Sequence, residues 1–304
     1  MRLVVGALLG ALLVVVGSPP GPAAAADTVL FQNSFANSTV DGTGTVAVPT
    51  STGGTNAACL TASGNSSAGP LLSCPGNIDI PGNGKLRLTN SSTNQVGGVF
   101  GATSFPTSSG LDVSFTSYQW GGGGADGLAF MLAAVDPVNP ATPTTMGPSG
   151  GSLGYSPAGG VRGLSNAYLG VGLDVFGNFS STDVQGSGCS PVLNITNSTP
   201  GAAVVRGPGN GLVGYCGLAT TFTGNGKIAL RAPTRAASAV PVQVLINPTG
   251  ASFTSDSGVS VAAGTYKVVV TPVGQSTNTL SGSLPAASTS LYPSATWLNA
   301  IGVP

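Results

Sequence analysis

The chain contains no histidine and no glutamate, so all nine of its acidic residues are aspartates. A histidine-dependent catalytic triad and a histidine-ligated zinc site are therefore excluded. Charged residues make up only 6% of the sequence, which excludes the clustered Lys and Arg that nucleic-acid binding requires. Aromatic residues are also few, at 6%, but the apolar share of 41% is large enough to form a core.

No stretch of the chain shows a helical 3.6-residue period over three turns. Short apolar or alternating runs, separated by turn residues, predict strands instead. The sequence therefore predicts an all-β protein in which two antiparallel sheets pack face to face as a jelly-roll sandwich. The predicted strands are 28–35, 85–89, 98–105, 111–120, 127–134, 168–176, 202–206, 227–231, 240–246, 265–272 and 279–284.

The N-terminus joins a short basic start, Met1-Arg2, to an apolar run that ends in small residues up to Ala26. This pattern is typical of a secretory signal peptide and is too short to serve as a membrane span. We expect residues 1–26 to be removed and residues 27–304 to form one sandwich domain. The protein is therefore predicted to be secreted, with no membrane span.

Four cysteines, Cys59, Cys74, Cys189 and Cys216, remain in the exported chain. An even count in an oxidising compartment indicates two disulfides, for which three connectivities are possible. We favour the local pairs Cys59–Cys74 and Cys189–Cys216, because each pair brackets a loop rich in Gly, Ser and Asn. A metal–thiolate site is disfavoured because no pair has the Cys-x-x-Cys spacing.

A run of oxygen donors follows the apolar strand residues at 169, 171 and 173. Asp174 stands at the end of that strand, and Phe176, Asn178 and Asp183 follow at offsets of 2, 4 and 9 residues. If the turn brings Asp183 back toward Asp174, the segment offers two carboxylates, an amide and a backbone carbonyl, which are the ligands that Ca²⁺ prefers. The alternative is an Asx-rich turn, in which Asp and Asn bind only local backbone groups.

Two further motifs precede this segment. Ala-Asp-Gly at 125–127 joins a run of four glycines to an apolar strand, and Gly-Ser-Leu-Gly follows at 151–154. Together with the segment 174–183, and in this order, these motifs resemble the L-type (legume-type) lectin family, in particular the lectin-like domains of secreted actinobacterial proteins. The resemblance runs from residue 29 to the C-terminus and implies a concanavalin-like sandwich, with a cis peptide at the Ala-Asp step.

The resemblance also implies metal ligands. Asp174, Asn178, Asp183 and the carbonyl of Phe176 match the family's calcium ligands, with waters completing the shell. The family's transition-metal site needs a Glu two residues before the first Asp, and a downstream His. This chain has Gly172 and no His, so we expect no transition metal and weakened calcium binding.

The same resemblance implies a sugar site. Asp126 matches the carboxylate that accepts hydrogen bonds from two sugar hydroxyls, while the Asn178 amide and the Gly151 backbone N–H would donate to the sugar. Tyr155 and Tyr215 are candidates to stack on the sugar face. The sequence therefore predicts a secreted carbohydrate-binding protein whose partners are glycans or polysaccharides.

Two other functions stay open. If Asp126 only caps a strand entry and Asp174 only holds a turn, the protein is a structural or adhesion module of lectin fold with a decayed sugar site. A polysaccharide-degrading enzyme is less favoured, because the Glu-x-Asp-x-x-Glu strand motif of related glycosidases cannot be formed without glutamate. An enzyme based on two aspartates stays formally open.

The end of the sequence carries one more expectation. Sandwiches of this family continue past a Trp-Leu pair, here at 297–298, into a further strand, whereas this chain stops at residue 304. We expect either that this strand is missing and an apolar edge is exposed near residues 29–35, or that the sequence is a fragmentary gene model. Pairing of sheet edges makes an oligomer compatible with the sequence.

Overall fold

The computed structural model describes residues 28–62, 69–76, 79–135, 141–190, 193, 195–222 and 226–286, together with the backbone of 297–302. The proposed signal peptide lies outside the described residues. Within the described part of the chain, no helix is both long and apolar enough to cross a membrane.

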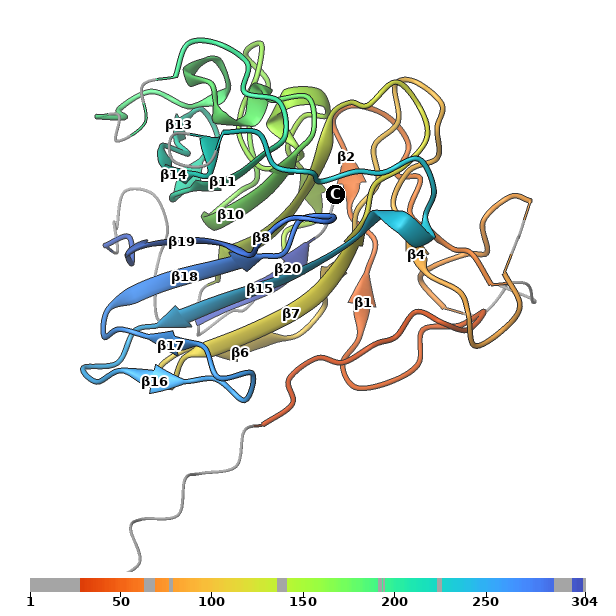
Figure 1. Cartoon of the computed structure of the whole chain (residues 1–304), viewed down its shortest axis with the longest axis horizontal. Helices are drawn as coiled ribbons and strands as arrows, with labels where there is room; N and C mark the ends of the chain where they lie inside the picture. The colour runs from red at the N-terminus through yellow and green to blue at the C-terminus, as the bar shows by residue number, and fades with distance from the viewer. Residues whose placement is uncertain are drawn as a thin grey trace, which may run out of the picture.

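Two antiparallel sheets form a sandwich, which confirms the predicted fold class (Figure 1). The smaller sheet has four strands in the order β19-β18-β15-β7, with bounds Asn278–Ser283, Thr265–Val270, Ala239–Asn247 and Leu111–Tyr118. The larger sheet has the order β13-β12-β10-β8-β20-β6, with bounds Val213–Gly214, Gly209–Asn210, Ala167–Asp174, Gly127–Ala134, Trp297–Gly302 and Ser104–Pro106. Strand β11 (Ala202–Arg206) also pairs with β10, and β14 (Gly217–Thr220) pairs with β11.

Short elements complete the fold. Strands β1, β2 and β4 lie to one side of the sandwich (Figure 1). The short strands are β1 (Val46–Ala47), β2 (Thr50–Ser51), β3 (Cys59–Leu60), β4 (Leu86–Arg87), β5 (Phe100–Gly101), β9 (Thr145–Met146), β16 (Phe253–Thr254) and β17 (Ser260–Val261). The 3₁₀ helices are η1 (Gly150–Ser152), η2 (Asn178–Ser180), η3 (Thr182–Val184) and η4 (Ala236–Ser238).

The central strands of the larger sheet, β8, β10 and β11, are buried on both faces. Strand β8 sends Leu128, Phe130 and Leu132 into the core between the two sheets. Its alternate residues Ala129 and Met131 enter a second core, formed with loops that cover the outer face. The near-continuous apolar sequence of β8 follows from this double burial, because both faces of the pleat need apolar side chains.

Most strand predictions are confirmed, and two are wrong. The predicted strands 127–134 and 202–206 coincide with β8 and β11. Residues 28–35 form only an isolated bridge, Gln32 to Thr43, and residues 227–231 form no strand. Isolated hydrogen bonds to different neighbours hold the segment 227–231 instead. The Ile228 N–H donates to the Gly201 carbonyl, and the Ala229 N–H donates to the Gln275 side chain. A ladder requires a regular series of such bonds along one neighbour, which this segment lacks.

Both predicted disulfides are present. Cys59 is bonded to Cys74 and Cys189 to Cys216, with sequence separations of 15 and 27 residues. The expected apolar exposure near the first segment is seen at Val29 and Leu30, which are 57% and 41% exposed. Residues 297–302, which begin with the Trp-Leu pair, form β20 between β8 and β6 of the larger sheet.

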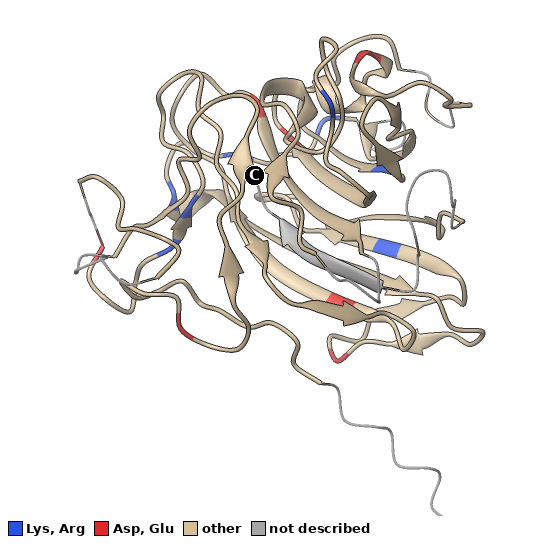
Figure 2. Cartoon of the chain, turned by 180° about the vertical axis from the view of Figure 1, so that it is seen from behind, with Lys and Arg blue, Asp and Glu red and all other residues tan. Residues whose placement is uncertain are grey.

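Charged residues are thinly scattered along the chain (Figure 2). One ion pair fastens the long N-terminal loop region to the sandwich: Arg235 Nη1 and Nη2 donate to the two carboxylate oxygens of Asp79 at 2.7 and 2.6 Å. These hydrogen bonds hold the pKa of Asp79 below its ordinary value of 3.8. The Arg235 guanidinium also lies 6.0 Å from the centre of the Trp120 ring.

We expect Asp79→Asn to lower the free energy of unfolding by about 2 kcal/mol at pH 7, because hydrogen bonds to a charged partner contribute on that scale. A carboxyl whose pKa is depressed in the folded state stabilises it above pH 3.8 and loses that contribution as the pH falls through the folded pKa. Urea unfolding at pH 7 and pH 3 should therefore show a gap between wild type and variant that closes in acid. Asp256→Asn, at an exposed residue, is the control; an equal gap at both pH values would contradict the role given to the ion pair.

Candidate functional site

The site begins where β8 and β10 meet. Asp174 is the last residue of β10 and pairs with Gly127, the first residue of β8, and with Ala202 of β11. Asp126 therefore lies directly beside Asp174. Its backbone carbonyl accepts hydrogen bonds from the N–H groups of Val175 and Phe176 at 3.0 and 2.9 Å. The peptide bond between residues 125 and 126 is cis, as the resemblance implies.

The glycine run before Asp126 is fastened rather than free. Arg231 Nη2 donates to the Gly121 carbonyl at 2.6 Å. A Cβ placed on Gly124 would lie 2.3 Å from Arg231 Nη1, so the side chain packs closely against the run. These contacts with Arg231 fix the backbone path of the glycine run that leads to Asp126.

The segment around η1 brings the third motif to the same place. A Cβ added to Gly150 would lie 4.0 Å from Asp126 Oδ2. A Cβ added to Gly151 would lie 2.5 Å from the Asn178 Cβ and 3.2 Å from its amide nitrogen. The structure thus brings Asp126, Gly151 and Asn178 together, although they are separated in sequence by 25 and 27 residues.

Asp174 is fully buried and holds the following turn. Its Oδ1 accepts a hydrogen bond from Gly177 N–H and its Oδ2 one from Phe179 N–H, both at 2.7 Å. Burial raises the pKa of Asp174 to about 7; these two hydrogen bonds oppose the shift, the neighbouring charge of Asp126 adds to it, and Arg206 opposes it. Burial also raises the pKa of the half-buried Asp126 carboxyl.

Two further candidate ligands, Phe176 and Asp183, form hydrogen bonds with other residues. The Phe176 carbonyl accepts a hydrogen bond from the Ser198 hydroxyl at 2.8 Å. Asp183 is exposed in η3, where its N–H donates to the Ser181 hydroxyl at 3.1 Å. The charged groups that shift the pKa of Asp174 are Asp126, which raises it, and Arg206, which lowers it.

The contacts favour the Asx-rich turn over a calcium shell. Both oxygens of the fully buried Asp174 already accept hydrogen bonds from backbone N–H groups, while Asp183 is exposed in η3. Across the described ranges, no three His, Cys, Asp or Glu side chains gather into a group that could hold a metal. Calcium binding stays a prediction of the resemblance, and the hydrogen bonds of Asp174 are those of the alternative Asx-rich turn.

The segment 195–200 supports the turn from outside. The Gly177 carbonyl accepts hydrogen bonds from Thr199 N–H at 2.9 Å and from the Ser180 hydroxyl at 3.0 Å. Gly177 has φ of 107°, and a Cβ added there would lie 2.4 Å from the backbone nitrogen of Pro200. Only glycine therefore fits this position.

Sequence reasoning missed Arg206 and Phe179, which lie beneath the site. Residues 202, 204 and 206 share the face of β11 that meets the loop core, so alternation along that strand could have shown that Arg206 points inward. The two tyrosines proposed to stack on a sugar, Tyr155 and Tyr215, are fully buried and cannot reach a ligand. The exposed aromatic at the turn is Phe176, which is 46% exposed.

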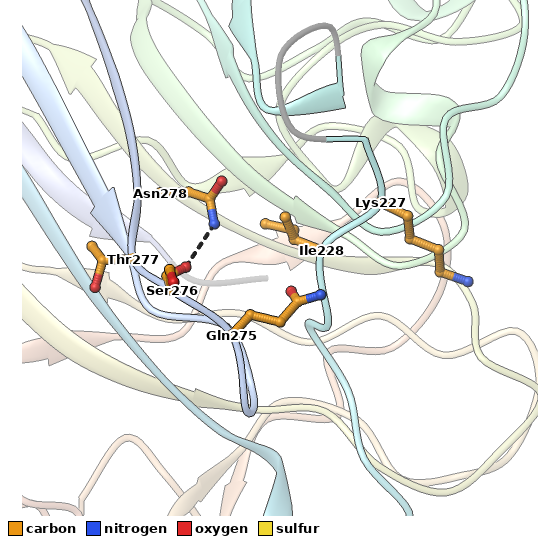
Figure 3. A pocket seen from close by; sticks show the side chains of 6 residues that line it. All are labelled: Lys227, Ile228, Gln275, Ser276, Thr277 and Asn278. Atoms are coloured by element: carbon orange, nitrogen blue, oxygen red, sulfur yellow. Dashed lines mark hydrogen bonds between the residues drawn. The ribbon is translucent and has the colours of Figure 1, made fainter.

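A cavity of about 260 Å³ lies away from these residues, beside the N-terminal end of β19 (Figure 3). It is lined by Lys227, Ile228, Gln275, Ser276, Thr277 and Asn278, and its surface is about equally polar and apolar. It shares no residue with the site formed by Asp126, Gly151 and Asn178.

No protein-family model and no curated protein matches the chain. Among solved structures it is similar to a peanut lectin with a nine-residue peptide (PVIWSSATG), at 20% identity and a TM-score of 0.40, covering 73% of this chain and 77% of that one. It is also similar to a Lotus tetragonolobus seed lectin isoform, at 13% identity and a TM-score of 0.34, covering 68% of this chain and 71% of that one.

Proposed function

We propose that this chain is a secreted carbohydrate-binding protein of the L-type lectin-like class, with its sugar site at Asp126, Gly151 and Asn178. The observation that carries the proposal is the convergence of these residues from three distant segments at one end of β8 and β10. To recognise neighbouring hydroxyl groups of a sugar, a protein must hold hydrogen-bond acceptors and donors in fixed positions, and the end of a rigid sheet does so.

Each group has a distinct role in this proposal. The half-buried Asp126 carboxylate accepts hydrogen bonds from two sugar hydroxyls, while the Asn178 amide and the Gly151 N–H donate to sugar oxygens. The exposed ring of Phe176 offers an apolar face against which the C–H face of a sugar can pack. All the groups that bind the sugar in this proposal belong to the chain itself, so the proposed site requires no metal ion.

The principal alternative is a structural or adhesion module that binds no sugar. The observation in its favour is that both oxygens of Asp174 serve the turn itself. A hydrolase based on Asp126 and Asp174 is disfavoured, because Asp174 is fully buried and cannot reach a glycosidic bond. We therefore propose a non-enzymatic protein.

The test is Asp126→Ala. We expect retention of the protein on immobilised polysaccharide, or on the glycans of an array that wild type selects, to fall roughly ten- to hundredfold. Removing an ionised acceptor of two hydroxyl hydrogen bonds costs about 1.5–3 kcal/mol, which corresponds to that loss of affinity.

The matched control is Asp256→Ala, which removes an exposed aspartate in the turn between β16 and β17. It should bind as wild type does, and both variants should unfold at the wild-type midpoint. Undiminished binding by folded Asp126→Ala would move the sugar site elsewhere. Absence of any glycan retained by wild type would favour the structural module.

A further inference from the structure

Arg206, the last residue of β11, is fully buried beneath the site. Its guanidinium donates three hydrogen bonds to backbone carbonyls: Nε to Phe179 at 2.7 Å, Nη1 to Tyr215 at 2.6 Å and Nη2 to Ser181 at 2.5 Å. The Phe179 ring lies 5.1 Å from the guanidinium carbon and covers its face. The charge is therefore solvated by protein groups, as a buried cation must be.

The carbonyls bound by Arg206 belong to two different loops. Phe179 and Ser181 belong to the turn that follows Asp174, whereas Tyr215 precedes Cys216 of a disulfide. One rigid fork thus ties the site turn and the disulfide-bonded loop to the same strand.

The fork is connected to the sugar site through Phe179. The Phe179 N–H donates to Asp174 Oδ2, while its carbonyl accepts from Arg206 Nε. Asn178, the proposed sugar-binding amide, immediately precedes Phe179 in the chain. The backbone that carries Asn178 is therefore fixed from one side by a carboxylate and from the other by a guanidinium.

Glycines in β10 leave space for the side chains that pack beneath the site. A Cβ placed on Gly172 would lie 2.3 Å from the Phe179 ring, so the bare backbone of β10 makes room for that ring. Gly170, which pairs with Arg206 across the strands, makes room in the same way for Tyr155: a Cβ there would lie 2.7 Å from the Tyr155 ring.

We propose that Arg206 is the built-in cation of this loop, a positioning residue that organises the Asp174–Ser181 turn without any metal ion. Backbone carbonyls such as those of Phe179 and Ser181 are also ligands for hard cations, but here they face a permanent positive charge that belongs to the chain. Resting on the proposed function, the inference further assigns metal-independent sugar binding to Asp126 and Asn178.

The direct test is amide hydrogen exchange of wild type in excess chelator, followed by addition of millimolar calcium. We expect the N–H groups of Gly177 and Phe179 to be protected in chelator and to gain no protection from calcium. Thermal unfolding midpoints should be the same in both buffers. Exchange at the rate of an unfolded chain in chelator, or a midpoint that rises with calcium, would overturn the inference.

Variants test the positioning role. Arg206→Met should speed exchange at Phe179 N–H by at least tenfold and weaken glycan retention. Arg206→Lys should restore both properties only in part, because a single ammonium group cannot bind three carbonyls in the geometry of the guanidinium. Arg162→Met, at an exposed arginine, is the control. If Arg206→Met does not fold, Phe179→Leu removes the ring but keeps both backbone bonds, and should show the same loss in smaller measure.

The outcomes separate the two proposals. Folded Arg206→Met with wild-type exchange at Phe179 would refute the positioning role whatever the ligand is. Wild type that is protected in chelator but retains no glycan would refute the proposed function and leave the built-in cation standing. Glycan retention that is lost in chelator while the turn stays protected would refute metal-independent binding alone.

Discussion

Gly177→Ala is expected to lower the free energy of unfolding by about 3–5 kcal/mol. A methyl group at this position would lie within 2.5 Å of three backbone atoms of Thr199 and Pro200, where no flexible side chain can yield. The φ of 107° adds a further cost of about 1–2 kcal/mol for a residue with a Cβ. Overpacking against backbone is costly because the neighbouring chain has to shift as a whole.

Gly258→Ala is the matched control for this variant. Gly258 also has a positive φ, 82°, but a Cβ there would meet no atom within 4 Å. Urea unfolding of the two variants at pH 7 separates the conformational cost, which both share, from the clash, which only Gly177→Ala suffers. Equal destabilisation of the two would show that the segment 195–200 does not press on the turn.

Asp174→Asn is expected to remove most of the pH dependence of stability between pH 4 and pH 7. The folded-state pKa of about 7 lies above the ordinary value of 3.8. A carboxyl shifted in this direction supports the folded state fully below pH 3.8, and its contribution is lost as the pH rises through 7. The difference of about three pH units corresponds to a loss on the order of 4 kcal/mol across that window.

The measurement is urea unfolding of wild type and variant at intervals between pH 4 and pH 8, in chelator so that no metal competes for the carboxylate. Wild type should lose stability steadily over the window, and the asparagine variant should show a much flatter curve. Asp183→Asn, at the exposed aspartate of η3, should keep the wild-type slope. An unchanged slope in Asp174→Asn would mean that the carboxyl is ionised without cost in the folded protein.

The strands that could be predicted are those marked by the residues of the strand itself, through alternation or an apolar run. Strand β7 alternates apolar and polar residues, β8 is an apolar run that begins at a glycine, and β11 is a short run between Gly201 and Gly207 that is apolar up to Arg206. Sequence alone therefore locates these strands. The segment 227–231 reads Lys-Ile-Ala-Leu-Arg, with apolar residues only at 228–230, and it has no neighbouring strand in register among the described residues. Whether such a segment joins a ladder is decided by distant residues, here Gly201 and Gln275, which no local pattern reveals.

The site could be predicted in part for a similar reason. Asp126, Asn178 and Gly151 stand in short motifs with defined spacing, and the structure brings them together. The role of Asp174 depends on which atoms face its carboxylate, and sequence spacing cannot distinguish a metal ion from the N–H groups of Gly177 and Phe179. Arg206 escaped notice because its partners are backbone carbonyls, which every residue possesses.

The double burial of β8 has a consequence for how the molecule comes apart. Phe130 belongs to the core between the sheets and Met131, its neighbour in the chain, to the core under the loops. Neither core can dissolve while the other keeps β8 in place, since the same backbone ladder serves both. The proposed sugar site, at the end of this shared strand, therefore belongs to a single cooperative unit rather than to a part that unfolds separately.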